Sequence, residues 1–303
     1  MIRAAAASAS APAEHAPPAD AVVQADVQRA LAEDLGSGDV TAALLPDTPA
    51  QAVLLCKEAA VVCGRPWFDA CHRALDPAVR IDWRVTEGER VAAGTVLATL
   101  AGRNRALVSA ERASLNFMQT LSGTATTVAA HVEAVRGARA PASDPRILDT
   151  RKTLPGLRAA QKYAVRVGGG VNHRMGLYDA VMLKENHVHA AGSLAAAIRA
   201  AKARYPGLPL IVEVETLAQL EQALREGCDR ILIDDFSAGD RREAVRISRA
   251  APHGGRIPLE VSGGVDLASV RAVAEDGVDC ISIGALTKNV RAIDLSLKLV
   301  PSR

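Results

Sequence analysis

The sequence predicts an α/β protein in which a small or incomplete barrel of parallel strands follows a separate N-terminal domain. Short apolar runs recur from residue 147 onward and alternate with helical segments, as expected of βαβ units. The runs end in polar groups, as strands do at the catalytic face of a (β/α) barrel. A full barrel takes about 250 residues, and 147–286 is too short for one.

The bulk composition is that of an ordinary globular protein. The 303 residues carry a net charge of +2, with 49% hydrophobic and 23% charged residues, which argues against a general nucleic-acid binder. No run of 18 apolar residues is present, so we expect no membrane span. Five cysteines without a C-x-x-C pair indicate free, buried thiols of a reducing, cytoplasmic compartment. The Ala/Pro-rich residues 1–20 predict a disordered tail.

The N-terminal part mixes helices with short strands. Residues 21–35 have the spacing of an amphipathic helix, which "GSGDVT" (36–41) ends. We expect a strand or strand pair at 51–63 and, because glycines punctuate an alternating pattern, short antiparallel strands at 81–102. Residues 105–136 predict a helix that is broken near Ser122-Gly123.

The C-terminal part contains the predicted parallel strands. They are the apolar runs at 147–148, 180–183, 210–214, 231–233, 257–261 and 280–283. Helices are expected after Ser193, after Thr216 and after Asp266. Gln219 stands three residues after Thr216, the spacing of a capping box.

Cations gather around the ends of the first two predicted strands. Arg151, Lys152, Arg174 and Lys184 stand there with His173. Burying several uncompensated cations is costly, so a pocket that holds them is expected to bind an anion. The Arg fork matches a carboxylate or a phosphate. By contrast, Arg158, Lys162 and Arg166 lie four residues apart and predict an exposed helical stripe.

Two acids and a set of glycines mark the other strand ends. Glu213 and Asp234 end consecutive strands and suit a divalent cation, with Mg²⁺ favoured by oxygen ligands; salt bridges to nearby lysines are an equally open alternative. Ser262, Gly263, Gly264 and Gly284 end the last two strands, where barrels commonly bind phosphate. Such a pocket suits the joining of a phosphorylated sugar to a small acid.

Several segments together resemble a known family. They are "EDLGSGDVT", "SAERASLNFMQTLSGTAT", "TRKTLPGLR", "KYAVRVGGGVNHRMGLYDAVMLKENH", "VEVET", "ILIDDF", "EVSGGV" and "SIGALT". In this order they resemble quinolinate phosphoribosyltransferase, also called carboxylating nicotinate-nucleotide pyrophosphorylase. The likeness spans roughly residues 25–290 and leaves the Ala-rich tail outside.

The resemblance implies an architecture and a reaction. It implies an α/β sandwich at 21–117, onto which 288–303 packs back, and an open, seven-stranded type of α/β barrel at 118–287. It also implies a homodimer with shared sites. The implied activity is the Mg²⁺-dependent transfer of phosphoribose from phosphoribosyl pyrophosphate to quinolinate, with decarboxylation, as in NAD biosynthesis.

The resemblance also implies roles for individual residues. Arg112 would reach the neighbouring subunit's pocket, and Lys152 would lie near the reacting centre. Arg151, His173, Arg174 and Lys184 would hold the two carboxylates of quinolinate. Glu213 and Asp234 would face the ribose and Mg²⁺ as candidate catalytic and metal-binding residues. Ser262, Gly263, Gly264 and Gly284 would hold the 5-phosphate.

One departure and three rival functions stay open. Asp235 stands in "DDF", where the family usually has Asp-Asn-Phe, and adds a negative charge at the metal end. The rivals are a barrel lyase or aldolase that uses Lys184 as a Schiff base, a non-catalytic protein that binds phosphorylated metabolites, and a related transferase with another acceptor. The number of cations favours an acceptor with two carboxylates.

Overall fold

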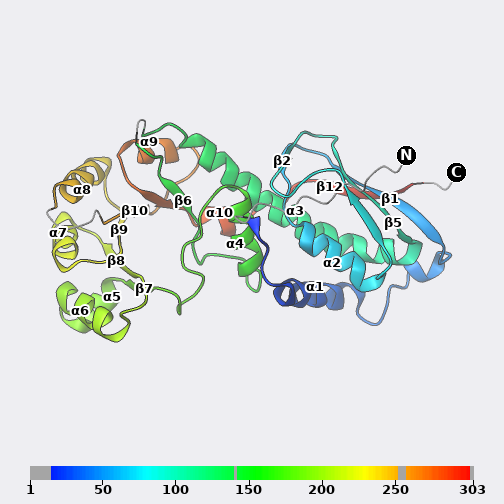
Figure 1. Cartoon of the computed structure of the whole chain (residues 1–303), viewed down its shortest axis with the longest axis horizontal. Coiled ribbons are helices and arrows are strands. Elements are labelled where there is room, and N and C mark those ends of the chain that lie inside the picture. The colour runs from blue at the N-terminus through cyan, green and yellow to red at the C-terminus, as the bar shows by residue number, and fades with distance from the viewer. Residues whose placement is uncertain (1–14, 140–141, 252–256, 301–303) are drawn as a thin grey trace, which may run out of the picture. The chain divides into compact units, whose positions relative to one another are not determined.

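The computed structural model describes residues 15–139, 142–251 and 257–300, which form two compact units (Figure 1). The first unit comprises the described residues up to Thr126, Ala159–Gly168 and those from Val290 onward. The second comprises Thr127–Arg158 and Gly169–Asn289. Residues 1–14 of the predicted tail lie outside the described residues, and the first helix begins at Asp20.

The first unit is built on a four-stranded antiparallel sheet with the order β12-β1-β5-β3. Its strands are β1 (Pro49–Cys56), β3 (Arg80–Trp83), β5 (Val96–Arg103) and β12 (Leu295–Val300), and β2 (Ala60–Val61) pairs separately with β4 (Arg90–Val91). Ala52, Leu54 and Cys56 are buried and alternate with more accessible residues along β1. One face of the sheet therefore packs into the core, as an alternating pattern requires.

Helices complete the first unit. They are α1 (Asp20–Leu35), α2 (Arg65–Leu75), α3 (Asn104–Ala134), which continues into the second unit, and α4 (Arg158–Val167), with a 3₁₀ turn η2 (Ala42–Leu44). The core includes Leu54 of the sheet, Phe68 of α2 and Leu115 of α3. The helix predicted at 21–35 is confirmed, since Val23, Val27 and Leu31 form its buried face.

The break predicted in the long helix is wrong, because α3 runs unbroken through Ser122 and Gly123. Ser122 uses its hydroxyl to donate to the carbonyl of Cys63 and to accept from the Cys63 N–H, both at 2.9 Å. A Cβ on Gly123 would lie 2.2 Å from the carbonyl oxygen of Arg291. The glycine therefore permits a close backbone approach and does not end the helix.

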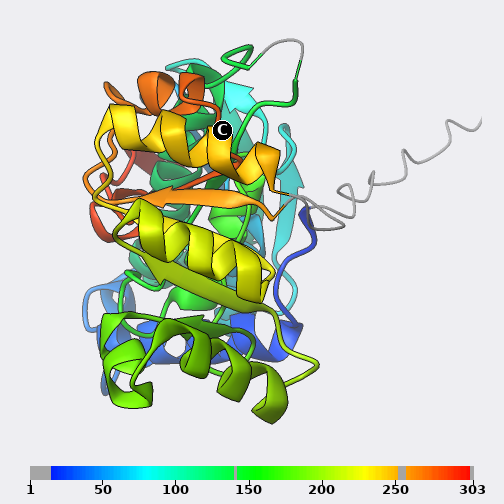
Figure 2. The ribbon, with the colours of Figure 1, turned by 90° about the vertical axis from the view of Figure 1, so that its left-hand side faces the viewer.

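The second unit is built on a six-stranded parallel sheet with the order β6-β11-β10-β9-β8-β7. Its strands are β6 (Arg146–Leu148), β7 (Val181–Leu183), β8 (Leu210–Val214), β9 (Arg230–Asp234), β10 (Leu259–Ser262) and β11 (Cys280–Ser282). Its helices are α5 (Glu185–Ala191), α6 (Leu194–Arg204), α7 (Leu217–Glu226), α8 (Ala238–Ala250), α9 (Val270–Glu275) and α10 (Ala285–Lys288). Figure 2 shows α6, α7 and α8, coloured green to gold, side by side in front of the strands. The six predicted strands are confirmed.

The sheet is an incomplete barrel, as predicted. Strands β6 and β7 stand at its two edges. Beyond β6 there is one further parallel bridge, between Leu148 and Val171. The seventh strand that the resemblance implies is therefore reduced to a single residue pair at this edge.

Helix starts follow local capping chemistry, with two differences from expectation. Ser193 and Thr216 each accept from the N–H three residues on, both at 3.2 Å. Gln219, however, accepts from the N–H of Glu215 at 2.7 Å and does not complete a capping box with Thr216. Helix α9 begins only at Val270, because a turn closed by Asp266 and Ser269 comes first.

The exposed stripe predicted on α4 is also wrong. Lys162 is 1% exposed, and Arg158 is half-buried. Residues on every side of this short helix are buried, including Gln161, Tyr163 and Val165. The four-residue spacing places the cations on one face, but this helix has no solvated face at Lys162.

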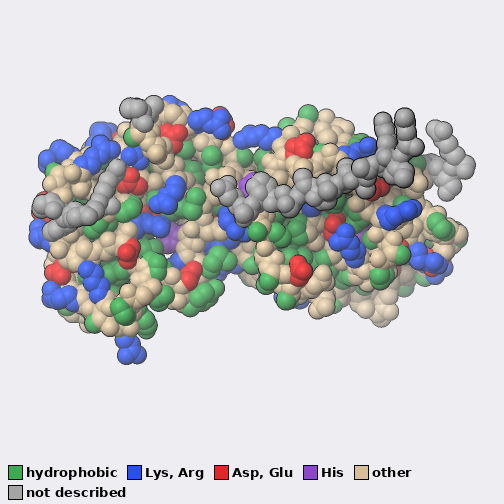
Figure 3. Space-filling view, in the orientation of Figure 1, with side chains coloured by type: hydrophobic (Ala, Val, Ile, Leu, Met, Phe, Trp, Pro, Cys, Tyr) green, Lys and Arg blue, Asp and Glu red, His purple; other side chains and the backbone are tan. Residues whose placement is uncertain are grey.

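Three expectations about the whole chain can be compared with the structure. The cysteines are free, and Cys56, Cys63, Cys71 and Cys280 are buried, as predicted. None of the helices in the described part of the chain has both the length and the apolar composition needed to cross a bilayer. Figure 3 shows basic and acidic side chains interspersed over the visible face.

Candidate active site

The parallel sheet brings the predicted strand-end groups to one edge. All six strands run the same way, so their carboxyl ends meet there. Ser262 is paired in register with Asp234 on neighbouring strands. Lys184 follows β7 directly, and Gly284 closely follows β11. The predicted residues of the second unit therefore gather at the strand edge where α/β enzymes bind their ligands.

The carboxylate side of this edge contains Glu213, Asp234 and Asp235. Lys184 Nζ forms an ion pair with Glu213 Oε2, so the alternative of salt bridges to lysines holds in part. Burial raises the pKa of Asp234, and the negative charges of Glu213 and Asp235 raise it further, although Lys184 and Lys152 oppose them. Carboxylates that repel one another in this way form a place where an added cation is stabilised.

The glycine side brings backbone close to functional side chains. Gly263 and Gly264 have φ values of 93° and 58°, and a Cβ on Gly263 would lie 2.7 Å from Asp235 Oδ1. A Cβ on Gly284 would lie 2.9 Å from Lys152 Cδ. These contacts place Lys152 against Gly284 and Asp235 against Gly263.

Lys152 is held by its own backbone while its side chain is exposed. Its N–H donates to Thr150 Oγ1 at 3.0 Å, and its carbonyl accepts from Thr287 Oγ1 at 2.8 Å. Because Thr287 belongs to α10, the loop after β6 is fixed to the segment after β11. The Lys152 ammonium is thus positioned over the glycine side of the edge.

The cation side is built around a buried carboxylate, Asp149. Asp149 accepts from the His173 N–H at 2.8 Å and from Asn172 Nδ2 at 2.6 Å. His173 Nδ1 in turn accepts from the Arg174 N–H at 2.7 Å. An accepting Nδ1 places the proton of a neutral ring on Nε2, which lies 3.4 Å from Glu260 Oε1. The ring of His173 is thereby directed at protein groups on both sides.

Glu260 is a buried acid in the middle of β10. It is 0% exposed, and its Oε2 lies 2.9 Å from Arg230 Nη1. Burial raises the pKa of Glu260, but its interactions with His173 and Arg230 outweigh burial, so the pKa lies below its ordinary value. Glu260 is therefore an anion that supports the cation side from within the sheet.

Arg174 and Arg151 are the two guanidinium groups of the cation side. Arg174 is half-buried, and its Nη1 donates to the carbonyl of Ala180 at 3.3 Å. Burial lowers the pKa of Arg174, the positive charge of Arg151 lowers it further, and Asp179 opposes both. Arg151 itself is exposed. Two cations that disfavour each other are prepared for an anion that satisfies both.

Two groups that shape this edge were missed in the sequence. Glu260 stands in the apolar run "IPLEV", and an acid inside a strand buried on both faces is the signal that could have found it. Arg158 donates to backbone around the cation side, but its four-residue spacing to Lys162 and Arg166 suggested a solvated face. Arg112, the other predicted cation, is exposed on α3 of the first unit.

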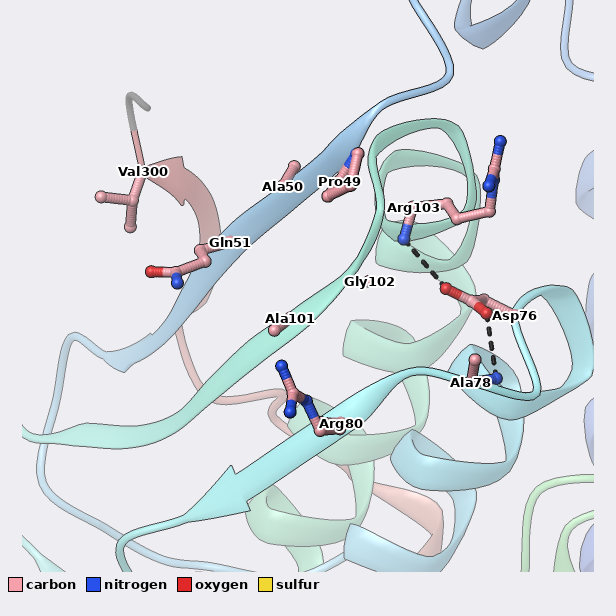
Figure 4. Close-up of a pocket in the computed structure, with 10 residues that line it drawn as sticks. All are labelled: Pro49, Ala50, Gln51, Asp76, Ala78, Arg80, Ala101, Gly102, Arg103 and Val300. Carbon is pink, nitrogen blue, oxygen red and sulfur yellow. Dashed lines mark hydrogen bonds between the residues drawn. The ribbon is translucent and has the colours of Figure 1, made fainter. Parts of the chain in front are cut away.

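A hollow in the first unit offers less chemistry. It has a volume of about 940 Å³ and is lined by Gln51, Arg80 and Arg103, among others (Figure 4). Its acid, Asp76, is already satisfied by the N–H groups of Arg103 at 2.9 Å and Ala78 at 3.0 Å. Arg103 is paired with Asp47. We therefore keep the strand edge of the second unit as the candidate site.

Comparison with known families assigns both parts of the chain. Residues 39–122 match the quinolinate phosphoribosyl transferase N-terminal domain, and residues 124–298 match the C-terminal domain of the same family. The chain belongs to the quinolinate phosphoribosyltransferase family. The resemblance seen in the sequence is confirmed, and so is the fold class of an N-terminal α/β domain with an incomplete parallel barrel.

Relatives of the quinolinate phosphoribosyltransferase family match over nearly the whole chain. The carboxylating nicotinate-nucleotide pyrophosphorylase of Mycobacterium leprae is 43% identical over an alignment of 282 residues that covers 90% of this chain and 95% of the relative. The chloroplastic enzyme of the same name from Arabidopsis thaliana is 38% identical and covers 91% of this chain and 82% of its own. The solved nicotinate-nucleotide pyrophosphorylase of Francisella tularensis is 40% identical, with a TM-score of 0.89 over 96% of this chain and 100% of its own.

Proposed function

We propose that this protein transfers phosphoribose from phosphoribosyl pyrophosphate to quinolinate and releases nicotinate mononucleotide, pyrophosphate and CO₂, a reaction of NAD biosynthesis. Family membership and relatives at about 40% identity support this activity. The observation that carries it is the strand edge, where a side with two guanidinium groups stands beside a side with carboxylates and glycines. These two sides suit a diacid and a phosphorylated sugar.

Quinolinate binds on the cation side. Arg151 and Arg174 pair with its two carboxylates, since planar forks match carboxylate oxygens in a bidentate way. Lys184 joins them when its ion pair with Glu213 opens. His173 fixes the backbone of Arg174 and acts through that residue.

The sugar binds on the opposite side. Ser262, Gly263, Gly264 and Gly284 surround the 5-phosphate with backbone N–H groups, and a Cβ on Gly264 would meet nothing within 4 Å. Glu213 and Asp234 face the ribose and stabilise the positive charge that develops on it. Lys152, which lies against Gly284, is positioned near the pyrophosphate leaving group.

Glu213 and Asp234 are also the residues that would hold Mg²⁺. Burial raises the pKa of Asp234, and the charges of Glu213 and Asp235 raise it further; a bound cation would relieve that repulsion. Among the described residues no group of three or more His, Cys, Asp or Glu forms a metal site. That fits Mg²⁺, which is commonly bound by one or two carboxylates together with substrate phosphates. When bound, the ion supplies charge that offsets the departing pyrophosphate.

Beyond the two substrates, the reaction needs only a proton from solvent. The pyridine nitrogen forms a bond to C1 of the ribose as the bond from C1 to pyrophosphate breaks. The ring is then cationic, so the C2 carboxylate leaves as CO₂, its electron pair stays on C2, and water supplies the proton. The chain contributes by positioning both substrates and by charge stabilisation.

We further propose a homodimer in which Arg112 of each chain reaches the site of the other. Its exposed position on α3 supports a role outside its own unit. The free, buried cysteines support the expected cytoplasmic location.

The test is a direct assay. The protein is incubated with quinolinate, phosphoribosyl pyrophosphate and Mg²⁺, and nicotinate mononucleotide and CO₂ are measured. Nicotinate in place of quinolinate separates a transferase with another acceptor, and absence of pyrophosphate release would indicate a binding protein. Borohydride trapping with a carbonyl substrate tests whether Lys184 forms a Schiff base. We expect no trapped adduct, because the Lys184 ammonium is ion-paired with Glu213.

A further inference from the structure

Arg158 makes three hydrogen bonds to groups near the cation side of the edge. Its Nε donates to Thr153 Oγ1 at 3.2 Å, and its Nη1 donates to the Met175 carbonyl at 3.2 Å. Its Nη2 donates to the carbonyl of Arg151 at 3.3 Å. The five N–H donors of a guanidinium stand in a fixed plane, so one side chain can hold several acceptors at once.

These acceptors belong to two different loops. Thr153 and Arg151 lie in the loop after β6, whereas Met175 lies in the loop before β7. Strands β6 and β7 are the two edges of the open sheet and do not pair with each other. Arg158 therefore connects the two loops on either side of the gap in the barrel.

Each connected loop carries one of the two guanidinium groups assigned to quinolinate. Arg151 is itself an acceptor residue, and Arg174 directly precedes Met175. Burial lowers the pKa of Arg174, and the positive charge of Arg151 lowers it further, so the two guanidinium groups repel each other before a ligand arrives. Without a connection between their backbones, the loops could relieve this repulsion by moving apart.

We infer that Arg158 is a positioning residue that holds Arg151 and Arg174 at the separation needed to bind both carboxylates of the diacid. This inference rests on the proposed function. The three bonds go to protein groups, so Arg158 acts through the loops and makes no substrate contact of its own. Lysine keeps the charge but is a point donor and cannot span the same acceptors.

Other contacts already order part of this region. The loop before β7 is already ordered by Asp179, which accepts from the N–H groups of Met175 at 2.7 Å and Gly176 at 3.1 Å. The start of that loop is fixed through Asp149 and His173. Arg158 adds a connection farther along both loops, between the carbonyls of Arg151 and Met175.

The experiment compares Arg158→Lys and Arg158→Gln with Arg271→Gln. Arg271 is a matched control in the same unit, because its Nη1 also donates to two backbone carbonyls, those of Ala134 and Arg136, before β6 begins. For each variant, KM for quinolinate, KM for phosphoribosyl pyrophosphate, kcat and Tm are measured.

We expect both Arg158 variants to raise the KM for quinolinate by about tenfold to 100-fold, as a displacement of roughly 1 Å can. The KM for phosphoribosyl pyrophosphate and the Tm should stay near the wild-type values, and Arg271→Gln should resemble the wild type. An unchanged KM for quinolinate, or equal increases in both KM values with a lower Tm, would overturn the inference. Thr153→Val removes a single bond and serves if the Arg158 variants fail to fold. It should raise the same KM by a smaller factor.

Failure of the proposed function gives a different result. In that case the wild type and Arg271→Gln would also form no nicotinate mononucleotide. If the wild type turns over quinolinate and the Arg158 variants do so equally well, the positioning role of Arg158 is contradicted but the proposed function is not.

Discussion

Arg174 holds its charge in surroundings that disfavour it. Burial and the neighbouring Arg151 both lower the pKa of its guanidinium. The charged form of Arg174 is stabilised when a carboxylate binds, because the negative charge offsets both the burial and the repulsion from Arg151. At the scale of single residues, the site is prepared for an anion by unfavourable interactions that exist before the anion binds.

Replacing Arg174 tests this preparation. We expect Arg174→Ala to weaken quinolinate binding by at least 100-fold, about the effect of removing a charged, hydrogen-bonded partner. Calorimetric titration with quinolinate alone measures the effect without turnover. Arg204→Ala, at the exposed end of α6, is the control and should bind normally. Near-normal binding by Arg174→Ala would contradict the assignment of the cation side.

Glu260 supplies a prediction with a pH dependence. Its folded-state pKa is lowered from 4.5, so its ionised form contributes stability at higher pH that is lost as pH falls through the folded-state value. Glu260→Gln leaves Arg230 without its buried partner and should cost about 3–5 kcal/mol of unfolding free energy at pH 7.

Urea unfolding at several pH values measures that cost. The difference between wild type and Glu260→Gln should shrink as pH falls below 4.5, the ordinary pKa of the carboxyl. Glu275→Gln, which removes an exposed i, i+4 partner of Arg271, should cost no more than about 0.5 kcal/mol. A pH-independent difference for Glu260→Gln would show that shape, not charge, is responsible.

At the scale of elements, α3 depends on one glycine. Alanine favours a helix interior over glycine by about 1 kcal/mol, yet a Cβ on Gly123 would lie 2.2 Å from the Arg291 carbonyl oxygen. We expect the overlap to dominate, so that Gly123→Ala destabilises the protein by about 1–3 kcal/mol. Gly207→Ala, where a Cβ meets nothing within 4 Å, is the control. The Tm of Gly123→Ala is compared with that of Gly207→Ala. Equal Tm values would contradict the packing argument.

The secondary-structure elements could be predicted where both faces of a strand are buried and the signal lies in neighbouring residues. The strands of the parallel sheet read as short apolar runs because both faces are covered. Gly123 misled because Arg291, which is distant in sequence, approaches it in the fold, and Lys162 misled because α4 is buried on every side there. The strand-end residues could be found in the sequence, because they follow apolar runs directly. Arg158 and Glu260 were missed, because their contacts form only when distant segments come together in the fold.

At the scale of the whole molecule, the proposed dimer with shared sites makes a prediction for mixed subunits. Arg112→Ala and Arg174→Ala should each be inactive as homodimers, because every site lacks one arginine. After subunit exchange at equal amounts, half of the dimers are mixed and each of these has one intact site. About a quarter of all sites, and of the wild-type activity, should then return.

The matched control mixes Arg151→Ala with Arg174→Ala. Both residues belong to the same unit, so every site in every dimer keeps a defect and no activity should return. Recovery in this control, or none with Arg112→Ala, would contradict sites shared across an interface.

The placement of β12 also has a consequence for biosynthesis. This strand pairs with β1, yet the entire second unit lies between the two strands in sequence. A nascent chain emerging from the ribosome therefore exposes the edge of β1 until β12 has been translated, and an open edge is prone to pair with another chain. Stalled or prematurely terminated synthesis should consequently yield aggregates, while the second unit, whose strands are contiguous, has already been completed.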